Sequence, residues 1–314
     1  MAMSVYCRWF FLIVVIYFLS VAPVGALVDH DPIVVNGDAG FAAGGFPGSG
    51  SVDDPYRIEG YRIVTSALQR NGVEVHDTSA YFVVRDCVIE ADYIGVLVED
   101  AAPGTASVVG NVITGGGQDG GGVSLGCDGV RVINNTCSGF VIGVHTNYAD
   151  GCEIAYNNFS YNVYHGVNLR YSRDCVVAHN TIVGNGAHGV FIIRDSTGNR
   201  IYNNTVAGNS AMKSYEWDNF YSFTVKSQGL DEGNGNLWYD ESGLGNRWSD
   251  YDGDGDYLID GSAGLVDKYP VAVEAPFVEP PGSGGGIPGF EARSVILGAA
   301  LVSFVLWLSR KPYP

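Results

Sequence analysis

The sequence predicts an all-β protein folded as a right-handed parallel β-helix, a solenoid with about 23 residues per coil. Residues of one type recur in columns at nearly constant spacing, and apolar residues alternate with polar ones next to each column. Gly followed by Val opens each unit, at Gly72, Gly95, Gly122, Gly143, Gly166 and Gly189. The residue two places after each Val is apolar in five of the six units, which is typical of a strand with one buried face. We expect the glycines to supply a tight bend.

A second stretch of each unit carries two further columns. Its inward positions are all β-branched aliphatic residues, at Val84, Val108, Val132, Ile154, Val177 and Ile201. Three residues later comes a polar column, at Cys87, Asn111, Asn135, Asn157, Asn180 and Asn204, and further Asn residues follow at 162, 185 and 209. Asn tolerates a left-handed bend, and stacked amides can bond along a solenoid axis. A β-sandwich has no reason to repeat side chains in columns, whereas coils stacked about 4.8 Å apart do.

The segments outside the repeats predict an exported, membrane-tethered protein. Residues 1–26 have the basic start, apolar core and small-residue end of a signal peptide. Residues 31–66 are expected to form the N-terminal cap and first coil, 67–211 the repeats, and 212–275 an aromatic and acidic C-terminal cap. The Gly- and Pro-rich residues 276–293 predict a flexible linker, and 294–309 a transmembrane or sorting helix. The predicted location is the cell surface, with the anchor in the cytoplasmic membrane.

Charge and cysteines restrict the partners and the cross-links. The net charge is −17, from 34 acidic and 17 basic residues, and it disfavours nucleic acid as a partner. Cys152 and Cys175 fall at the same inward position of adjacent coils, but stacked parallel neighbours seldom reach disulfide geometry. We therefore expect small buried thiols.

The repeat unit and the C-terminal segment of the sequence resemble those of a known family. The unit G-V-x-[LI] followed by V-x-x-N-x-[IV]-x-x-N looks like the repeats of NosD-type, pectin-lyase-like parallel β-helix proteins. The tail from Gly245 to Pro270, GNRWSDYDGDGDYLIDG followed by DKYP, resembles the closing segment of archaeal NosD-like surface proteins, with Arg247 where that pattern usually has Tyr. Pro288-Gly289-Phe290, the apolar helix and a basic end resemble a PGF-type sorting signal. The resemblance implies the fold and, through the NosD name, a link to copper-site assembly.

Two groups of residues suggest metal binding. The first predicts a calcium site, because alternating carboxylates with interleaved Gly can turn several oxygens inward, and its residues are Asp250, Asp252, Asp254, Asp256 and Asp260. A solvated acidic turn is the alternative. The second is the pair His165 and His188, which stack in successive coils and could hold copper. Since no Met or Cys falls in register beside them, copper is disfavoured and turn histidines are expected.

One face carries outward aromatic and charged residues that suit sugar rings and carboxylates. These candidate glycan contacts are Tyr148, Arg170, Tyr171, Arg173, Asp174, Arg194 and Asp195. The pairs Arg173-Asp174 and Arg194-Asp195 are expected to recur one coil apart, either as a binding surface or as a salt-bridged ladder. No position requires a catalytic role, and we assign none. Three N-glycosylation sequons begin at Asn134, Asn158 and Asn203.

The functional expectation is a non-catalytic, membrane-anchored surface protein that contacts polysaccharide or envelope proteins. A polysaccharide lyase or hydrolase of the same fold is the first alternative, and a NosD-like copper accessory protein is the second. Fold alone cannot choose among them, because function depends on sites carried by the fold.

Overall fold

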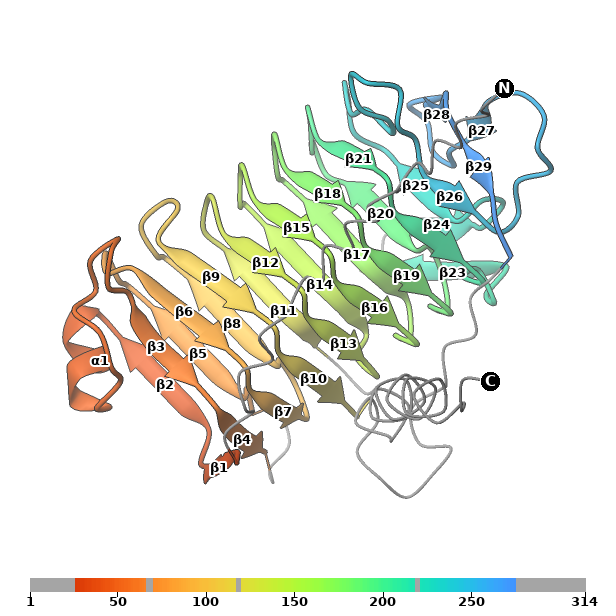
Figure 1. Cartoon of the computed structure of the whole chain (residues 1–314). Coiled ribbons are helices and arrows are strands. Elements are labelled where there is room, and N and C mark those ends of the chain that lie inside the picture. The colour runs from red at the N-terminus through yellow and green to blue at the C-terminus, as the bar shows by residue number, and fades with distance from the viewer. Residues whose placement is uncertain (1–25, 66–69, 117–119, 218–220, 275–314) are drawn as a thin grey trace, which may run out of the picture.

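The computed structural model describes residues 26–274, except 66–69, 117–119 and 218–220. The chain forms an all-β parallel β-helix of about 8 turns with about 24 residues per turn, as the columns predicted. Figure 1 shows the coils side by side, from α1 (Asp38–Ala43) at one end to β27 (Tyr257–Leu258), β28 (Val266–Asp267) and β29 (Val271–Ala272) at the other. Each regular coil contributes one short strand to each of three parallel sheets.

The three sheets, named here A, B and C, run the length of the solenoid. Sheet A has ten strands, namely β1 (Val28–His30), β4 (Tyr61–Val64), β7 (Val88–Ala91), β10 (Val112–Gly115), β13 (Thr136–Ser138), β16 (Asn158–Ser160), β19 (Thr181–Val183), β22 (Thr205–Ala207), β26 (Arg247–Trp248) and β29 (Val271–Ala272). Sheet B has eight, namely β2 (Ile33–Asn36), β5 (Val73–His76), β8 (Val96–Glu99), β11 (Gly121–Gly126), β14 (Ile142–Asn147), β17 (His165–Arg170), β20 (Val190–Ile193) and β25 (Gly229–Asp231). Sheet C has seven, namely β3 (Tyr56–Glu59), β6 (Phe82–Arg85), β9 (Ala106–Val109), β12 (Arg131–Ile133), β15 (Glu153–Ala155), β18 (Val176–Ala178) and β21 (Arg200–Tyr202).

Two antiparallel hairpins stand apart from these sheets. They are β23 (Ser214–Trp217) with β24 (Tyr221–Thr224), and β27 (Tyr257–Leu258) with β28 (Val266–Asp267). Both lie in the segment expected to form the C-terminal cap. In that segment β25, β26 and β29 also continue sheets A and B, so it adds coil structure as well as covering.

The predicted inward columns form the core. The valines that follow the column glycines pair with one another across sheet B and are fully buried, at Val73, Val96, Val123, Val144, Val167 and Val190. The aliphatic column of sheet C is equally buried, at Val84, Val108, Val132, Ile154, Val177 and Ile201. Burying a side chain of this size contributes about 1.5–3 kcal/mol, so the stacked columns supply the main apolar driving force.

The glycine column has a different cause from the one expected. None of its six members has a positive φ, so none makes a left-handed bend. The coils approach too closely for a side chain there: a Cβ on Gly166 would lie 2.4 Å from Ile182 Cγ2 and 2.9 Å from the carbonyl oxygen of Gly189. The expectation of a bend is wrong, and the column instead marks close packing of backbone on backbone.

The asparagine column forms the expected ladder between sheets C and A. Each Nδ2 donates to the Oδ1 of the Asn one coil further on, for example Asn157 to Asn180 at 3.0 Å. The same Nδ2 donates to a buried carbonyl oxygen of the preceding coil, which for Asn157 is that of Val132 at 2.8 Å. The left-handed residue is the one before the column Asn, such as Tyr156 with φ 59°, so the bend does not belong to Asn itself.

Both ends of the solenoid are covered by aromatic rings. At the N-terminal end Phe41 of α1 is fully buried and stacks on Tyr56, with ring centroids 4.7 Å apart. At the other end Trp238 and Trp248 are fully buried beneath the last coil. Such covering protects the terminal strands from pairing with other chains.

Two sequence predictions concern cross-links and membrane spans. Cys152 and Cys175 are both free and buried, in agreement with the expectation of thiols. In the part of the chain that the structure describes, no helix combines the length and apolarity needed to cross a membrane. The predicted signal peptide (1–26, of which only residue 26 is described), the predicted linker 276–293 and the predicted helix 294–309 lie outside the described residues.

The ladder makes the first testable prediction. Asn180→Ala removes the acceptor of Asn157 and the donor to the carbonyl oxygen of Ile154 and to Asn204. We expect the free energy of unfolding to fall by about 3 kcal/mol, because several buried polar groups lose their partners. Urea unfolding measures the change. Thr181→Ala, on the outer side of the adjacent strand, serves as the control, with an expected loss below about 1 kcal/mol. Equal effects of the two variants would contradict a special role for the ladder.

Candidate functional site

The outer face of sheet B carries the candidate site. In β17, Val167 and Leu169 point into the core, so the residues between and after them, Asn168 and Arg170, point outward. The parallel register extends these positions into two outward rows. The first row runs Ser124, His145, Asn168, Phe191 and Leu230, and the second runs Gly126, Asn147, Arg170 and Ile193.

A pair of stacked tyrosines borders these rows at the corner that leads to sheet C. Tyr148 and Tyr171 lie one coil apart with ring centroids 4.4 Å apart and planes within 8°. Both have left-handed backbone, with φ of 55° and 48°, which turns the side chain out from the corner. Tyr148 is 64% exposed, and the guanidinium carbon of Arg170 lies 5.5 Å from the Tyr171 ring centroid. The corner therefore presents an aromatic surface with a cation beside it.

A pocket of about 540 Å³ adjoins the tyrosines on the C-terminal side. Its wall is formed by the sheet B corner, by β24 and by the residue after β25. The lining residues are Tyr171, Ile193, Arg194, Asp195, Ser222, Phe223 and Glu232. The pocket thus combines an arginine, two carboxylates and two aromatic rings.

The structure brings five of the seven predicted glycan contacts together and separates two. Arg170 pairs with Ile193, so Arg194 directly follows β20 as Tyr171 directly follows β17, and Tyr171 N donates to the carbonyl oxygen of Arg194. Arg173 pairs instead with Thr197, and it lies with Asp174 at the exposed turn into sheet C. The expectation that Arg173-Asp174 recurs as Arg194-Asp195 is therefore wrong, because the partner of Arg173 is Thr197, three residues after Arg194.

His165 and His188 are not turn histidines. Both are fully buried on the outer side of sheet B, in a second apolar cluster that includes Phe191 and Tyr215. The His165 ring lies flat on Phe191, with centroids 4.1 Å apart. Burial lowers the pKa of both histidines, and for His188 a hydrogen bond to Asp260 partly offsets this. The neutral forms are therefore the stable ones in the fold.

The same histidines do not fit a copper ion. His188 Nδ1 pairs with the Tyr215 hydroxyl at 2.9 Å, and its Nε2 pairs with Asp260 at 3.3 Å. His165 Nδ1 lies 3.3 Å from the carbonyl oxygen of His188. Within the described ranges, no three His, Cys, Asp or Glu side chains come together as a metal site.

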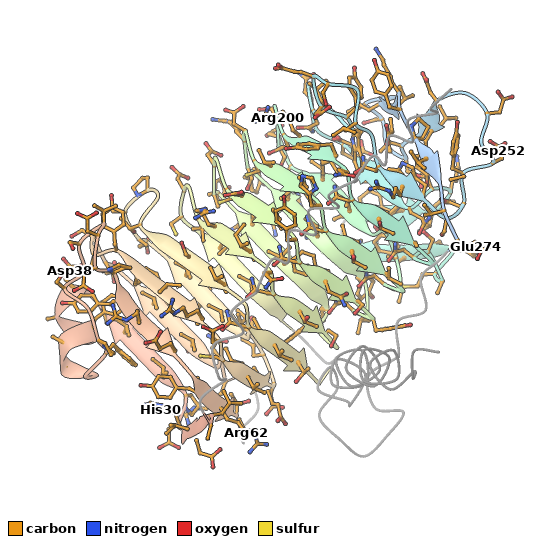
Figure 2. All side chains as sticks on the ribbon, in the orientation of Figure 1. His30, Asp38, Arg62, Arg200, Asp252 and Glu274 are labelled. Atoms are coloured by element: carbon orange, nitrogen blue, oxygen red, sulfur yellow. The ribbon has the colours of Figure 1, made fainter. Side chains whose placement is uncertain are left out.

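The acidic tail is divided between two roles. Asp250 accepts hydrogen bonds from Gln228 Nε2 at 2.6 Å and from the Tyr257 hydroxyl, and Asp260 accepts from the backbone N–H groups of Lys226 and Ser227. These two carboxylates hold the C-terminal coil together. Asp252, Asp254 and Asp256 are exposed. Figure 2 shows Asp252 on a loop at the C-terminal end of the rod. Calcium binding by this loop stays a prediction.

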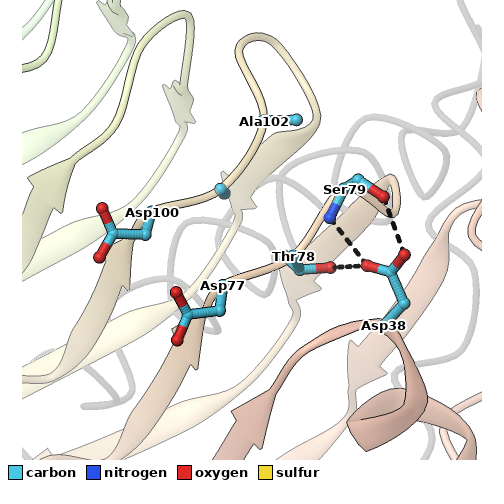
Figure 3. A pocket seen from close by; sticks show the side chains of 7 residues that line it. Asp38, Asp77, Thr78, Ser79, Asp100 and Ala102 are labelled. Atoms are coloured by element: carbon cyan, nitrogen blue, oxygen red, sulfur yellow. Dashed lines mark hydrogen bonds between the residues drawn. The ribbon is translucent and has the colours of Figure 1, made fainter.

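A second pocket lies near the N-terminal end, about 630 Å³ in volume and lined by Asp38, Asp77 and Asp100 among others (Figure 3). Asp38 accepts hydrogen bonds from the Thr78 hydroxyl at 2.6 Å and from the N–H and hydroxyl of Ser79 at 2.7 and 2.8 Å. These bonds lower the pKa of Asp38 to about 2. The arrangement ties α1 to the next coil, which is a structural role.

The three sequons lie on the strand corners and outer surface between sheets C and A. Asn134 is exposed, Asn158 is half-buried, and the Asn203 amide is paired with His179 and Arg247. Glycosylation stays a prediction at each of them.

Sequence reasoning missed the outward polar residues of sheet B. His145, Asn147 and Asn168 occupy the variable positions of the G-V-x-[LI]-x unit. The signal was present, since every second residue of a buried-face strand points outward and polar residues there gather in rows.

Comparisons with known proteins give a family and a fold. The family model described as periplasmic copper-binding protein (NosD) matches residues 49–253. No match was found among curated proteins. DFA-IIIase from Arthrobacter chlorophenolicus A6 without its lid is similar in structure, with a TM-score of 0.50 and 16% identity over 70% of this chain and 60% of that one. The Dettilon tailspike protein gives a TM-score of 0.40 and 13% identity over 76% and 53%. At these identities the likeness shows the fold alone.

The acidic loop gives a testable prediction. If Asp252, Asp254 and Asp256 bind calcium, millimolar Ca²⁺ should raise the melting temperature, because the ion binds only the folded state. Differential scanning calorimetry with and without chelator measures the effect. Asp254→Ala should abolish it, whereas Asp77→Ala, at the opposite end, should not. A melting temperature indifferent to chelator would count against the site.

The buried histidines predict acid sensitivity. The pKa of His165 lies well below its ordinary value in the fold, so the unfolded chain binds the extra proton as pH falls below about 6.5. Stability from the neutral ring is present above that pH and is lost below it, by up to about 1.4 kcal/mol per pH unit. Urea unfolding between pH 7.5 and 5.5 measures the slope. His165→Phe should flatten it and the exposed His30→Phe should not. A wild-type profile that is flat in this range would refute the idea.

Proposed function

Since the chain belongs to the NosD family, described as periplasmic copper-binding proteins, we propose that it is exported and that the outer face of sheet B binds a glycan. The observation that carries this proposal is the stacked pair Tyr148 and Tyr171 with Arg170 beside it, next to the pocket at Arg194. Aromatic faces pack against the apolar faces of sugar rings, while neighbouring polar groups pair with sugar hydroxyls.

The geometry suits a chain laid along the solenoid. The tyrosines and Arg194 occupy successive corners, one per coil, so an extended ligand meets a repeating set of contacts. The 540 Å³ pocket is large enough to seat one or two sugar units at the end of that path. Binding to envelope proteins through the same surface is part of the wider proposal.

Tethering to a membrane belongs to the proposal as well. Its support is in the sequence: a signal-like segment at 1–26, a Gly- and Pro-rich linker at 276–293 and an apolar segment at 294–309 followed by Arg310 and Lys311. Cell fractionation that recovers the chain with membranes in an accessible, protease-sensitive form tests this part. Recovery of the intact precursor in the cytosol would contradict it.

A polysaccharide lyase or hydrolase is the second candidate, and one observation favours it. Asp195 and Glu232 both line the pocket beside Arg194, and paired carboxylates are the usual acid and base of glycoside hydrolysis. Against this, both side chains are exposed, and Glu232 is hydrogen-bonded to Ser262. The non-catalytic function is therefore preferred. Reducing-end or unsaturated-product release, lost in Asp195→Asn, would reverse that preference.

The binding proposal predicts the effect of a single aromatic. Tyr148→Ala should weaken binding to the best glycan on an array by about tenfold, which corresponds to about 1.4 kcal/mol, because the exposed ring loses its contact with the sugar. Isothermal titration calorimetry measures the dissociation constant. Tyr156→Ala is a matched control, since Tyr156 is 59% exposed and stacks on His179 at 4.7 Å on another corner. Equal losses in both variants, or none in either, would remove the support for this site.

A further inference from the structure

One polar side chain on the outer face of sheet B is buried without partners. Asn168 is 0% exposed, and neither its Nδ2 nor its Oδ1 has a hydrogen-bond partner among the described residues. The half-buried Asn147 likewise has an unpaired Oδ1. The ladder asparagines differ, since the Oδ1 of Asn157 accepts from Asn135 Nδ2 and its Nδ2 donates to Asn180 Oδ1. Leaving a buried polar group unpaired costs about 1–3 kcal/mol, and nothing in the fold offsets that cost at Asn168.

The position of this amide connects it to the candidate site. Asn168 lies in the first outward row, between His145 and Phe191, and Asn147 lies beside Arg170 in the second row. Exposure rises outward from this point: Asn168 is fully buried, Asn147 and Arg170 are half-buried, and Tyr148 is 64% exposed. The unpaired amide therefore lies beneath the outer face of sheet B, one row away from the residues that precede the stacked tyrosines.

The unpaired atoms define the chemistry of a matching ligand. The two carbonyl oxygens, on Asn147 and Asn168, need hydrogen-bond donors, and the Asn168 Nδ2 needs an acceptor. A carboxylate or phosphate group offers acceptors only and would face two carbonyl oxygens. A pair of neighbouring hydroxyls offers a donor and an acceptor together, because each hydroxyl can do both. If the Asn168 amide is turned over, so that its oxygen and nitrogen change places, the match is unchanged, because either hydroxyl can donate or accept.

We propose, building on the glycan-binding function, that the ligand is a neutral sugar chain whose vicinal hydroxyls pair with Asn147 and, once the side chains that cover it move aside, with Asn168. The stacked tyrosines pack against the face of the sugar ring, and the two amides form hydrogen bonds with the hydroxyls at its edge. Two features favour a neutral sugar over an anionic one. The unpaired carbonyl oxygens of Asn147 and Asn168 need hydrogen-bond donors, and the protein has a net charge of −17, which repels polyanions at long range. Arg170 and Arg194 then act at the rim of the site.

The test compares ligands and an isosteric variant in the purified full chain. The probes are hexasaccharides of neutral glucose, mannose and galactose units, the same sugars with their vicinal hydroxyls O-methylated, and hexasaccharides of uronic acids. We expect wild type to bind a neutral probe at least tenfold more tightly than its methylated form and than any uronate. Asn168→Leu should lose about tenfold in affinity for that probe. Its melting temperature should be unchanged or raised, because the variant removes an unpaired polar group from a buried position.

The outcomes separate this inference from the function it rests on. Binding to uronates alone, with Tyr148→Ala still weakening it, would overturn the neutral-sugar inference and leave glycan binding standing. Undiminished affinity in Asn168→Leu would also overturn the inference. A fall of several degrees in the melting temperature of Asn168→Leu would assign the amide a structural role and overturn it too. Failure of every glycan to bind wild type would refute both proposals.

Discussion

The amide ladders of asparagine are the interaction on which the rest of the structure depends. At each corner the backbone turns out of a sheet, and its buried carbonyl groups lose their place in the strand-to-strand pattern. The column Asn supplies the missing partner: Asn180 Nδ2 bonds the carbonyl oxygen of Ile154 at 2.8 Å and the Oδ1 of Asn204 at 2.9 Å. A coil that gained or lost a residue at this corner would break both bonds, so the ladder fixes the register that aligns every other column.

The ladders also have a direction, and it explains the acidic C-terminal segment. Every ladder amide donates one N–H to the side chain of the next coil on the C-terminal side, so the last amide needs an acceptor that no further coil provides. Carboxylates fill that need: Asn246 donates to Asp267, Asn236 donates to Asp231, and Gln228, at the end of a third ladder, donates to Asp250. Burial raises the pKa of Asp231 and Asp267, while the hydrogen bonds lower it. A charged acceptor at the donor end of aligned dipoles is favourable for the same reason as at a helix N-terminus.

The corners that the ladders fix also create the candidate site. Left-handed backbone at Tyr148, Tyr171 and Arg194 costs about 1–2 kcal/mol per residue, yet it places one side chain per coil in line along the outer surface. Ring stacking between the tyrosines recovers part of that cost. The β23–β24 hairpin then closes one end, burying the histidine cluster and contributing Ser222 and Phe223 to the pocket. The repeating coils therefore set the spacing of the side chains in the site, and the β23–β24 hairpin, which is not part of the repeat, forms a wall of its pocket.

The sequence by itself determined the parallel β-helix, its inward columns and the asparagine ladder, because each coil encodes the same short-range geometry and repetition makes it visible. It also pointed to Tyr148, Tyr171 and Arg194, which occupy one column. Only the tertiary structure decided the rest. It separated Arg173 and Asp174 from the site, because identical dipeptides in adjacent coils fall out of register when the coils differ in length. It buried His165 and His188 under a hairpin from outside the repeat, and it left the amide of Asn168 unpaired. It also made Asp250 the acceptor for Gln228, the last amide of a ladder. Those outcomes depend on contacts between segments with no common period, and such contacts leave no pattern along the chain.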